Sequence, residues 1–183
     1  MPITKLDEQT ALVVIDLQKG IIAMPTVHPA SAIVARAAQL ARAFREKDLP
    51  VVLVNVAGSA PGRTDAGPFN GTRPDDWAEL VPELNAQPGD HRVTKRRWGA
   101  FLGTDLDAYL RSQGVTQIVL AGISTSIGVE STARSAYDLG YNVVFVIDAV
   151  TNRDADAHKN SMERIFPRMA ETDTTESVLK MLR

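Results

Sequence analysis

Three residues that lie far apart in the sequence could form one reaction site: Asp16, Lys95 and Gly128. Asp16 follows the apolar run "ALVVI", Lys95 ends the run "HRVTK", and Gly128 follows "TQIVLAGISTSI". The last stretch predicts a strand feeding a helix, where α/β enzymes commonly present a nucleophile. A carboxyl group beside an ammonium group could pass a proton to a bound molecule. Because Gly128 has no side chain and the chain contains no cysteine, a thiolate route through an acyl-enzyme is excluded.

Each of these residues also has a purely structural interpretation. Asp16 could cap a loop by accepting backbone hydrogen bonds, and Lys95 could belong to a solvated basic cluster with its two arginine neighbours. Gly128 could simply allow a helix to pack closely on the sheet. Hydroxyl groups near Gly128 could replace the thiol, but Thr125 and Ser126 fit better as helix N-caps. No histidine occurs near this segment of the sequence to serve as their base.

Short apolar runs alternate with amphipathic segments along the chain. The runs predict strands at 10–17, 50–56, 91–95, 116–122 and 142–148. Helical spacing and end signals predict helices at 29–48, 104–114 and 127–140, and a closing helix at 174–183. This alternation predicts a single domain over residues 1–183, with a Rossmann-like three-layer α/β/α fold and a mostly parallel sheet. The ligand site is then expected at the carboxyl ends of the strands.

Composition narrows the class of protein further. A net charge of −2 gives no electrostatic footprint for nucleic acid. No apolar run approaches the roughly 20 residues that span a bilayer, and the first residues lack the apolar core of a signal peptide. We therefore expect a cytoplasmic protein that acts on a small molecule, without nucleic-acid or membrane partners. The segment 58–76, rich in glycine and proline, is expected to be a loop that shapes specificity.

The order of the motifs resembles the isochorismatase-like hydrolases, also called the cysteine hydrolases. Three features carry the resemblance: Asp-x-Gln in "TALVVIDLQKG", the lysine of "KRRWGAF", and the Gly-x-x-Thr turn in "AGISTSIGVES". In most of that family a cysteine stands at the position of Gly128 and forms a triad with the equivalents of Asp16 and Lys95. The isochorismatase branch has glycine there and hydrolyses a vinyl ether, releasing pyruvate from isochorismate.

By this resemblance, Asp16 is the general acid that protonates the methylene carbon of an enol ether, and water attacks the resulting cation. For that role burial must raise the pKa of Asp16 against the opposing effect of Lys95. Lys95 could instead neutralise a carboxylate of the substrate. The resemblance also implies a non-proline cis peptide at Ile123–Ser124 that aims N–H groups at a substrate oxygen. The residues that it suggests for substrate binding are Gln18, Trp98, Ile123, Ser124 and Ile127.

Gln18 could instead be a solvated loop residue. Trp98 and Phe101 could line an apolar wall of the pocket, with core packing or an oligomer contact as the alternative, and for Phe101 we expect that alternative. The nicotinamidase branch holds a metal with an Asp-x-His pair after its second strand, and here that strand ends "VNVAGSAPG". The three histidines, His28, His91 and His158, show no ligand spacing and are expected at the surface or at caps. We therefore predict no metal and no other cofactor.

Two other functions stay open. Loss of the cysteine is also how an amidase would become inactive, so the chain could be a silent relative that binds a small ligand or serves as an oligomeric subunit. An amidase-type hydrolase that uses a route without cysteine is the remaining alternative. The resemblance implies a homodimer or homotetramer.

Overall fold

Six parallel strands form the centre of the protein in a computed structural model that describes residues 1–65, 67 and 72–182. Their order across the sheet is β3-β2-β1-β4-β5-β6, with the first strand of the chain in the middle. The strands are β1 (Thr10–Ile15), β2 (Val51–Val56), β3 (His91–Lys95), β4 (Gln117–Ile123), β5 (Asn142–Thr151) and β6 (Glu171–Asp173). The chain order reverses between β1 and β4, and open α/β sheets bind ligands at such a point.

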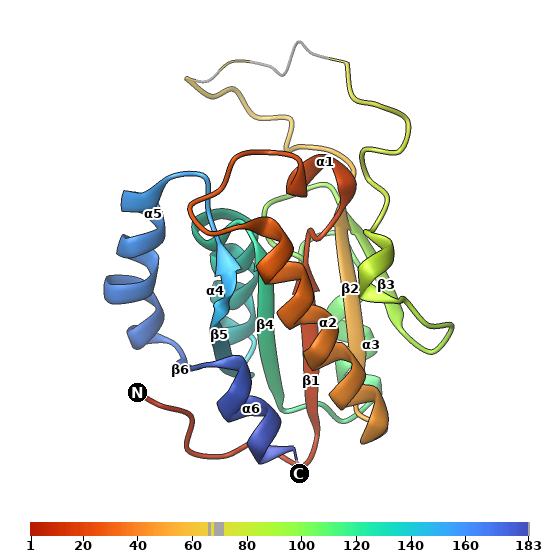
Figure 1. Cartoon of the computed structure of the whole chain (residues 1–183), viewed down its shortest axis with the longest axis vertical. Coiled ribbons are helices and arrows are strands. Elements are labelled where there is room, and N and C mark those ends of the chain that lie inside the picture. Colours follow the sequence, from red (N-terminus) through yellow and green to blue (C-terminus); the bar gives the residue numbers. More distant parts are fainter. Residues whose placement is uncertain (66, 68–71, 183) are drawn as a thin grey trace.

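Helices cover both faces of the sheet, which gives the three layers visible in Figure 1. On one face α2 (Ala30–Glu46) and α6 (Thr175–Met181) pack on the sheet, and on the other face lie α3 (Leu106–Ser112) and α4 (Glu130–Asp138). The shorter helical elements are α1 (Lys19–Ile22), α5 (Ala155–Asn160), the π-helical turns η2 (Thr125–Val129) and η3 (Ser161–Ile165), and the 3-10 turns η1 (Pro82–Leu84) and η4 (Phe166–Arg168).

The apolar runs that predicted strands are buried because both faces of the sheet are covered. Every residue of β1 and β4 is buried, as expected for central parallel strands. One core cluster joins α2 and α6 to the sheet, and the other joins α3 and α4 to its opposite face. The predicted α/β/α class and parallel sheet are therefore confirmed.

The element boundaries differ from the prediction in ways that matter for the site. The helix expected at 127–140 is divided into η2 and α4, and β5 continues to Thr151, three residues beyond its expected end. The short strand β6 was not predicted, because three half-buried residues, "ETD", carry no apolar pattern. In the expected loop 58–76, residues 66 and 68–71 lie outside the described part of the chain, as does Arg183 of the expected closing helix.

Close contact between β1 and β4 brings the two halves of the site together. Ile15 pairs with Gly122 at the carboxyl end of β1. Gly122 has a φ of +130°, and a Cβ atom there would lie 2.1 Å from the carbonyl oxygen of Ile15. Only glycine fits this position, and the close approach places the turn after β4 directly beside the residue that follows Ile15.

Candidate active site

Asp16 and Lys95 form a buried ion pair at the carboxyl edge of the sheet. Lys95 Nζ lies 2.7 Å from Asp16 Oδ2, and only 2% of Lys95 and 4% of Asp16 are exposed. Asp16 turns the chain out of β1 with a φ of +53°, a conformation that aspartate tolerates better than most residues. The solvated basic cluster considered for Lys95 is therefore wrong, since its ammonium reaches inward and also donates to the carbonyl of Arg97 at 3.2 Å.

The carboxyl group of Asp16 holds its proton more tightly than an ordinary aspartate. Burial raises its pKa to about 6, and the attraction of the Lys95 ammonium opposes that rise. Oδ2 faces the ammonium, whereas the buried Oδ1 has no hydrogen-bond partner among the described residues. A buried oxygen without a partner is costly, so Oδ1 is suited to meet a bound molecule. The loop-capping interpretation, in which this carboxyl accepts backbone hydrogen bonds, does not describe Asp16.

Gly128 lies against this ion pair. A Cβ atom at Gly128 would lie 3.1 Å from Asp16 Oδ2, 3.5 Å from Lys95 Nζ and 3.0 Å from Ile15 Cγ2. The structure thus brings together all three residues that the sequence singled out. The first and third of these distances are tighter than ordinary contacts, so the carboxyl group already occupies the space into which a side chain at Gly128 would project.

The turn η2 presents Gly128 to the ion pair. The N–H of Val129 donates to the carbonyl of Ser124 at 3.1 Å, which closes a wide π-helical ring in place of an ordinary α-helical start. Such turns occur often at functional sites. The sequence did not single out Thr132, which is fully buried. Its hydroxyl donates to the Gly128 carbonyl at 2.6 Å and accepts from the Ala100 N–H at 3.1 Å. Thr132 thereby ties the turn to the segment after Lys95.

The peptide bond between Ile123 and Ser124 is cis, as the resemblance implied. The Ile123 side chain is buried in a core cluster, so only its backbone can face a ligand. Ser124 is half-buried and Ile127 is partly exposed beside Gly128. Direct binding of substrate by these residues stays a prediction.

The side chain of Gln18 contacts backbone groups inside the protein, whereas the sequence suggested substrate binding or a solvated loop residue. It is fully buried, which excludes a solvated loop residue. Its two amide N–H groups donate to the carbonyls of Val56 and Trp77, at 3.0 and 3.1 Å, and its carbonyl accepts from the Val56 N–H at 2.7 Å. Both donors are committed to the backbone, so Gln18 fastens the loop after β1 to β2 and to the segment around Trp77.

Trp98 lines a cavity, as predicted, although the residue is 65% exposed. The cavity has a volume of about 1150 Å³, and Arg97, Leu102 and Ser131 are among its other lining residues. Ser131 follows Gly128 by three residues, so this cavity lies about one helical turn from the ion pair. Phe101 packs against the core beside Tyr141, with ring centroids 5.9 Å apart, in agreement with its expected role.

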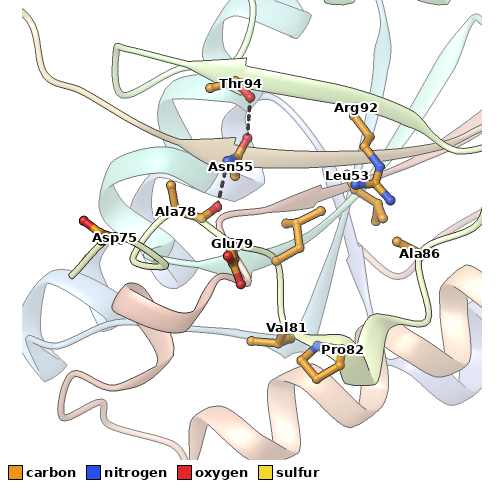
Figure 2. Close-up of a pocket in the computed structure, with 11 residues that line it drawn as sticks. Leu53, Asn55, Asp75, Ala78, Glu79, Val81, Pro82, Ala86, Arg92 and Thr94 are labelled. Atoms are coloured by element: carbon orange, nitrogen blue, oxygen red, sulfur yellow. Dashed lines mark hydrogen bonds between the residues drawn. The ribbon is translucent and has the colours of Figure 1, made fainter. Parts of the chain in front are cut away.

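A second cavity, of about 480 Å³, lies on the sheet beside β2 and β3. Figure 2 shows the side chain of Asn55 between Thr94 and Ala78, accepting from the Thr94 hydroxyl at 2.7 Å and donating to the Ala78 carbonyl at 2.8 Å. The residues that line it do not include the ion pair. The Asn55 amide is occupied by these contacts, and Asp75, Glu79 and Arg92 are the charged residues among those that line the cavity.

The hydroxyl groups that were expected to cap the helix have other partners. Thr125 Oγ1 lies 2.9 Å from Nδ1 of His158, and Ser126 Oγ accepts from the Asn152 side chain at 2.9 Å. The N-cap prediction for these two residues is therefore wrong. The argument that no histidine is available is also wrong, because α5 returns His158 to this turn. His28 and His158 lie together with ring centroids 5.1 Å apart, although they are separated by 130 residues in the sequence.

Residues 1–65, 67 and 72–182 contain no cluster of three or more His, Asp or Glu side chains arranged to hold a metal ion. Within the same residues, no helix combines the length and the apolar character needed to cross a membrane.

The doubly wound parallel sheet and the ion pair beneath a helix-initiating turn define an α/β enzyme of the isochorismatase-like class. The chain belongs to the isochorismatase family, a family of hydrolases, because the model of the isochorismatase domain matches residues 10–177.

Individual relatives agree with this assignment. The isochorismatase family protein YwoC of Bacillus subtilis is 44% identical over 183 residues, which cover 96% of this chain and 95% of YwoC. The structure of an isochorismatase family protein from Burkholderia thailandensis superposes with a TM-score of 0.93 at 44% identity, covering 97% of each chain. N-carbamoylsarcosine amidase from Thermoplasma acidophilum superposes with a TM-score of 0.78 at 30% identity, covering 92% of this chain and 97% of the amidase.

Proposed function

We propose that this protein hydrolyses an enol ether of the isochorismate type, with Asp16 as the general acid. The observation that supports this most strongly is the state of the Asp16 carboxyl group. It is buried, its pKa is raised to about 6, and its Oδ1 lacks a partner among the described residues. A general acid works best with a pKa near the working pH, and this carboxyl group meets that condition.

The reaction requires no covalent intermediate. Asp16 transfers its proton to the methylene carbon of the enol ether, and the adjacent carbon becomes an oxocarbenium-like centre. Water attacks this centre, the hemiketal collapses to pyruvate and an alcohol, and the proton released from water restores Asp16. Lys95 limits how far burial raises the pKa of Asp16, so that the acid can give up its proton and regain it.

The absence of a nucleophile supports this chemistry over acyl transfer. Gly128 offers no side chain, the chain has no cysteine, and the Thr125 hydroxyl is fully buried against His158. A covalent route needs an activated nucleophile that reaches the substrate.

Amide hydrolysis is the second candidate, and several relatives favour it, among them ureidoacrylate amidohydrolases and N-carbamoylsarcosine amidase. N-carbamoylsarcosine amidase, by its name, acts on an amide, and this chain matches it over nearly its full length. Without a thiol, such a reaction would use the ionised form of Asp16 as a general base for water. The two candidates therefore need opposite protonation states of the same carboxyl group.

The direct test is to incubate the purified protein with isochorismate and related enolpyruvyl ethers and to measure pyruvate. A parallel series with simple amides and ureido compounds measures ammonia. We expect pyruvate release that is lost in Asp16→Asn. Equal, slow pyruvate release by wild type and Asp16→Asn would refute acid catalysis, and a protein inactive in both series would favour the silent, ligand-binding relative.

A further inference from the structure

A polar cluster outside the ion pair holds the outer side of η2. The Thr125 hydroxyl lies 2.9 Å from His158 Nδ1, and the Asn152 amide donates to the Ser126 hydroxyl at 2.9 Å. The carbonyl of Asn152 in turn accepts from the Val27 N–H at 2.8 Å. These contacts join η2 to the end of β5, to α5 and to the loop before α2, which are distant in the sequence.

The distance between the Thr125 hydroxyl and His158 Nδ1 is that of a nucleophile and its base. The hydroxyl lacks the exposure that a nucleophile needs. Thr125 is 0% exposed, and its hydroxyl is engaged by His158, whereas Asp16 Oδ1 has no partner among the described residues. Gly128, three residues further along, is the part of the turn that lies against Asp16 and Lys95. The pair is therefore placed to hold the turn and not to attack a substrate.

Backbone hydrogen bonds close the turn at both ends, and side chains from neighbouring segments hold its two sides. Two backbone bonds close its first half, from the N–H groups of Ile127 and Val129 to the Ser124 carbonyl, and no side chain caps its N-terminus. Thr132 holds the inner side through the Gly128 carbonyl. His158 and Asn152 are the contacts on the outer side.

The surroundings of His158 favour the neutral imidazole that this contact uses. Burial and the neighbouring His28 both lower the pKa of His158. His28 is itself held by Thr151, whose hydroxyl accepts from the His28 N–H at 3.0 Å and lies 3.3 Å from its Nδ1. A neutral ring can accept a hydrogen bond from the Thr125 hydroxyl at Nδ1.

We propose that His158 is a positioning residue that acts through the Thr125 hydroxyl to fix η2, and thereby Gly128, against the Asp16–Lys95 pair. The clearance above Asp16 is small, since a Cβ at Gly128 would already lie 3.1 Å from Oδ2. Displacement of reacting groups by about 1 Å can lower a rate by about 100-fold. The consequence for catalysis rests on the proposed function, whereas the effect of His158 on the turn does not.

Two amide substitutions separate the Nδ1 contact from simple packing. In His158→Asn the side-chain amide takes roughly the place of Nδ1, whereas in His158→Gln it takes the place of Nε2. Thr125→Val removes the hydroxyl at nearly constant volume, and Thr125→Ser keeps it. His91→Gln, at the opposite end of β3 from Lys95, is the matched histidine control.

Hydrogen exchange of the amides of residues 124–129 is measured first, because it needs no substrate. We expect His158→Gln and Thr125→Val to speed this exchange by about tenfold or more, and His158→Asn, Thr125→Ser and His91→Gln to stay within about twofold of wild type. The same two disruptive variants are expected to lower kcat for pyruvate release by about tenfold, with KM changed by less than about twofold.

Several results would overturn the proposal. Unchanged exchange in His158→Gln would show that the histidine does not hold the turn, and equal effects of the Asn and Gln substitutions would show that Nδ1 is not the group that matters. Loss of activity in Thr125→Val with wild-type exchange would point to Thr125 as a nucleophile. If the exchange pattern is as expected but wild type releases no pyruvate, the positioning role stands and the proposed reaction fails.

Discussion

The pH dependence of the reaction tests the role of Asp16 most directly, because the two candidate reactions need opposite forms of its carboxyl group. Burial raises the pKa of Asp16 to about 6. With that value, about half of the molecules carry the proton at pH 6, about one in ten at pH 7 and about one in a hundred at pH 8. Acid catalysis then predicts that kcat/KM falls about tenfold per pH unit above 6 and levels off below it.

The assay follows pyruvate release between pH 5 and 8.5, with the enzyme-free rate of ether hydrolysis subtracted at each pH. Lys95→Met is the informative variant, because it removes the ammonium that lowers the pKa of Asp16 while keeping an unbranched side chain of similar length. Its alkaline limb is expected to move to higher pH by about one unit or more. Asp16→Asn is the control that has no proton to give.

A rate that rises with pH through 6 would refute acid catalysis and identify Asp16 as a general base, as amide hydrolysis by activated water requires. The pH profile would also be flat if product release, and not proton transfer, limited the rate. A single-turnover measurement removes that step, and the fall in rate above pH 6 must then reappear. An alkaline limb that stays in place in Lys95→Met would show that the pair does not control the reacting proton.

Three further predictions concern stability. Gln18→Ala leaves the Val56 N–H and the carbonyls of Val56 and Trp77 without their partner. We expect the free energy of unfolding, measured by urea titration, to fall by about 2–4 kcal/mol. An effect below about 0.5 kcal/mol would refute the fastening role. Thr132→Val keeps the volume but unpairs the Gly128 carbonyl and the Ala100 N–H, so we expect a loss of about 1–3 kcal/mol by the same measurement. The pKa of Asp16 is raised from 3.8 to about 6 in the folded state, so this group makes the free energy of unfolding fall by roughly 3 kcal/mol as pH rises from about 3 to 7. This fall should be absent in Asp16→Asn.

The sequence predicted the sheet and the ion pair because both depend on local signals. Apolar runs on both sides of the pleat mark central parallel strands, and Asp16 follows such a run. Lys95 is the last residue of the edge strand β3, whose sequence is mixed. The carboxyl ends of parallel strands meet at one edge, so two strand ends are enough to place the pair. The burial of Lys95 was not predictable from "KRR", because local composition does not tell which of the three side chains turns inward.

Contacts between distant segments were beyond the reach of pattern analysis. His158 is 33 residues from Thr125, and neither has a neighbour in the sequence that suggests the other. Gln18 was assigned by motif to the substrate, but its partners are backbone groups of Val56 and Trp77, which carry no sequence signature. The π-helical start of η2 depends on how β4 and α4 meet, so a helical periodicity that begins at residue 127 could not predict it.

Gly128 and the position of Asp16 depend on each other, and Gly128→Cys tests that dependence. A side chain at Gly128 begins 3.1 Å from Asp16 Oδ2 and 3.0 Å from Ile15 Cγ2, so the carboxyl group and the isoleucine must yield by a few tenths of an ångström to admit it. The thiol displaces the acid from the place where it would meet an enol ether, and we expect pyruvate release to fall by about tenfold or more. The introduced thiol should lie beside Lys95, whose positive charge favours the thiolate, so it should react faster with iodoacetamide than an ordinary cysteine does.

Turnover of amides by this variant would show that the covalent machinery of the family is otherwise intact and would favour descent from an amidase. Pyruvate release at the wild-type rate would show that Asp16 does not need the space above Gly128, and acid transfer at this position would then be wrong.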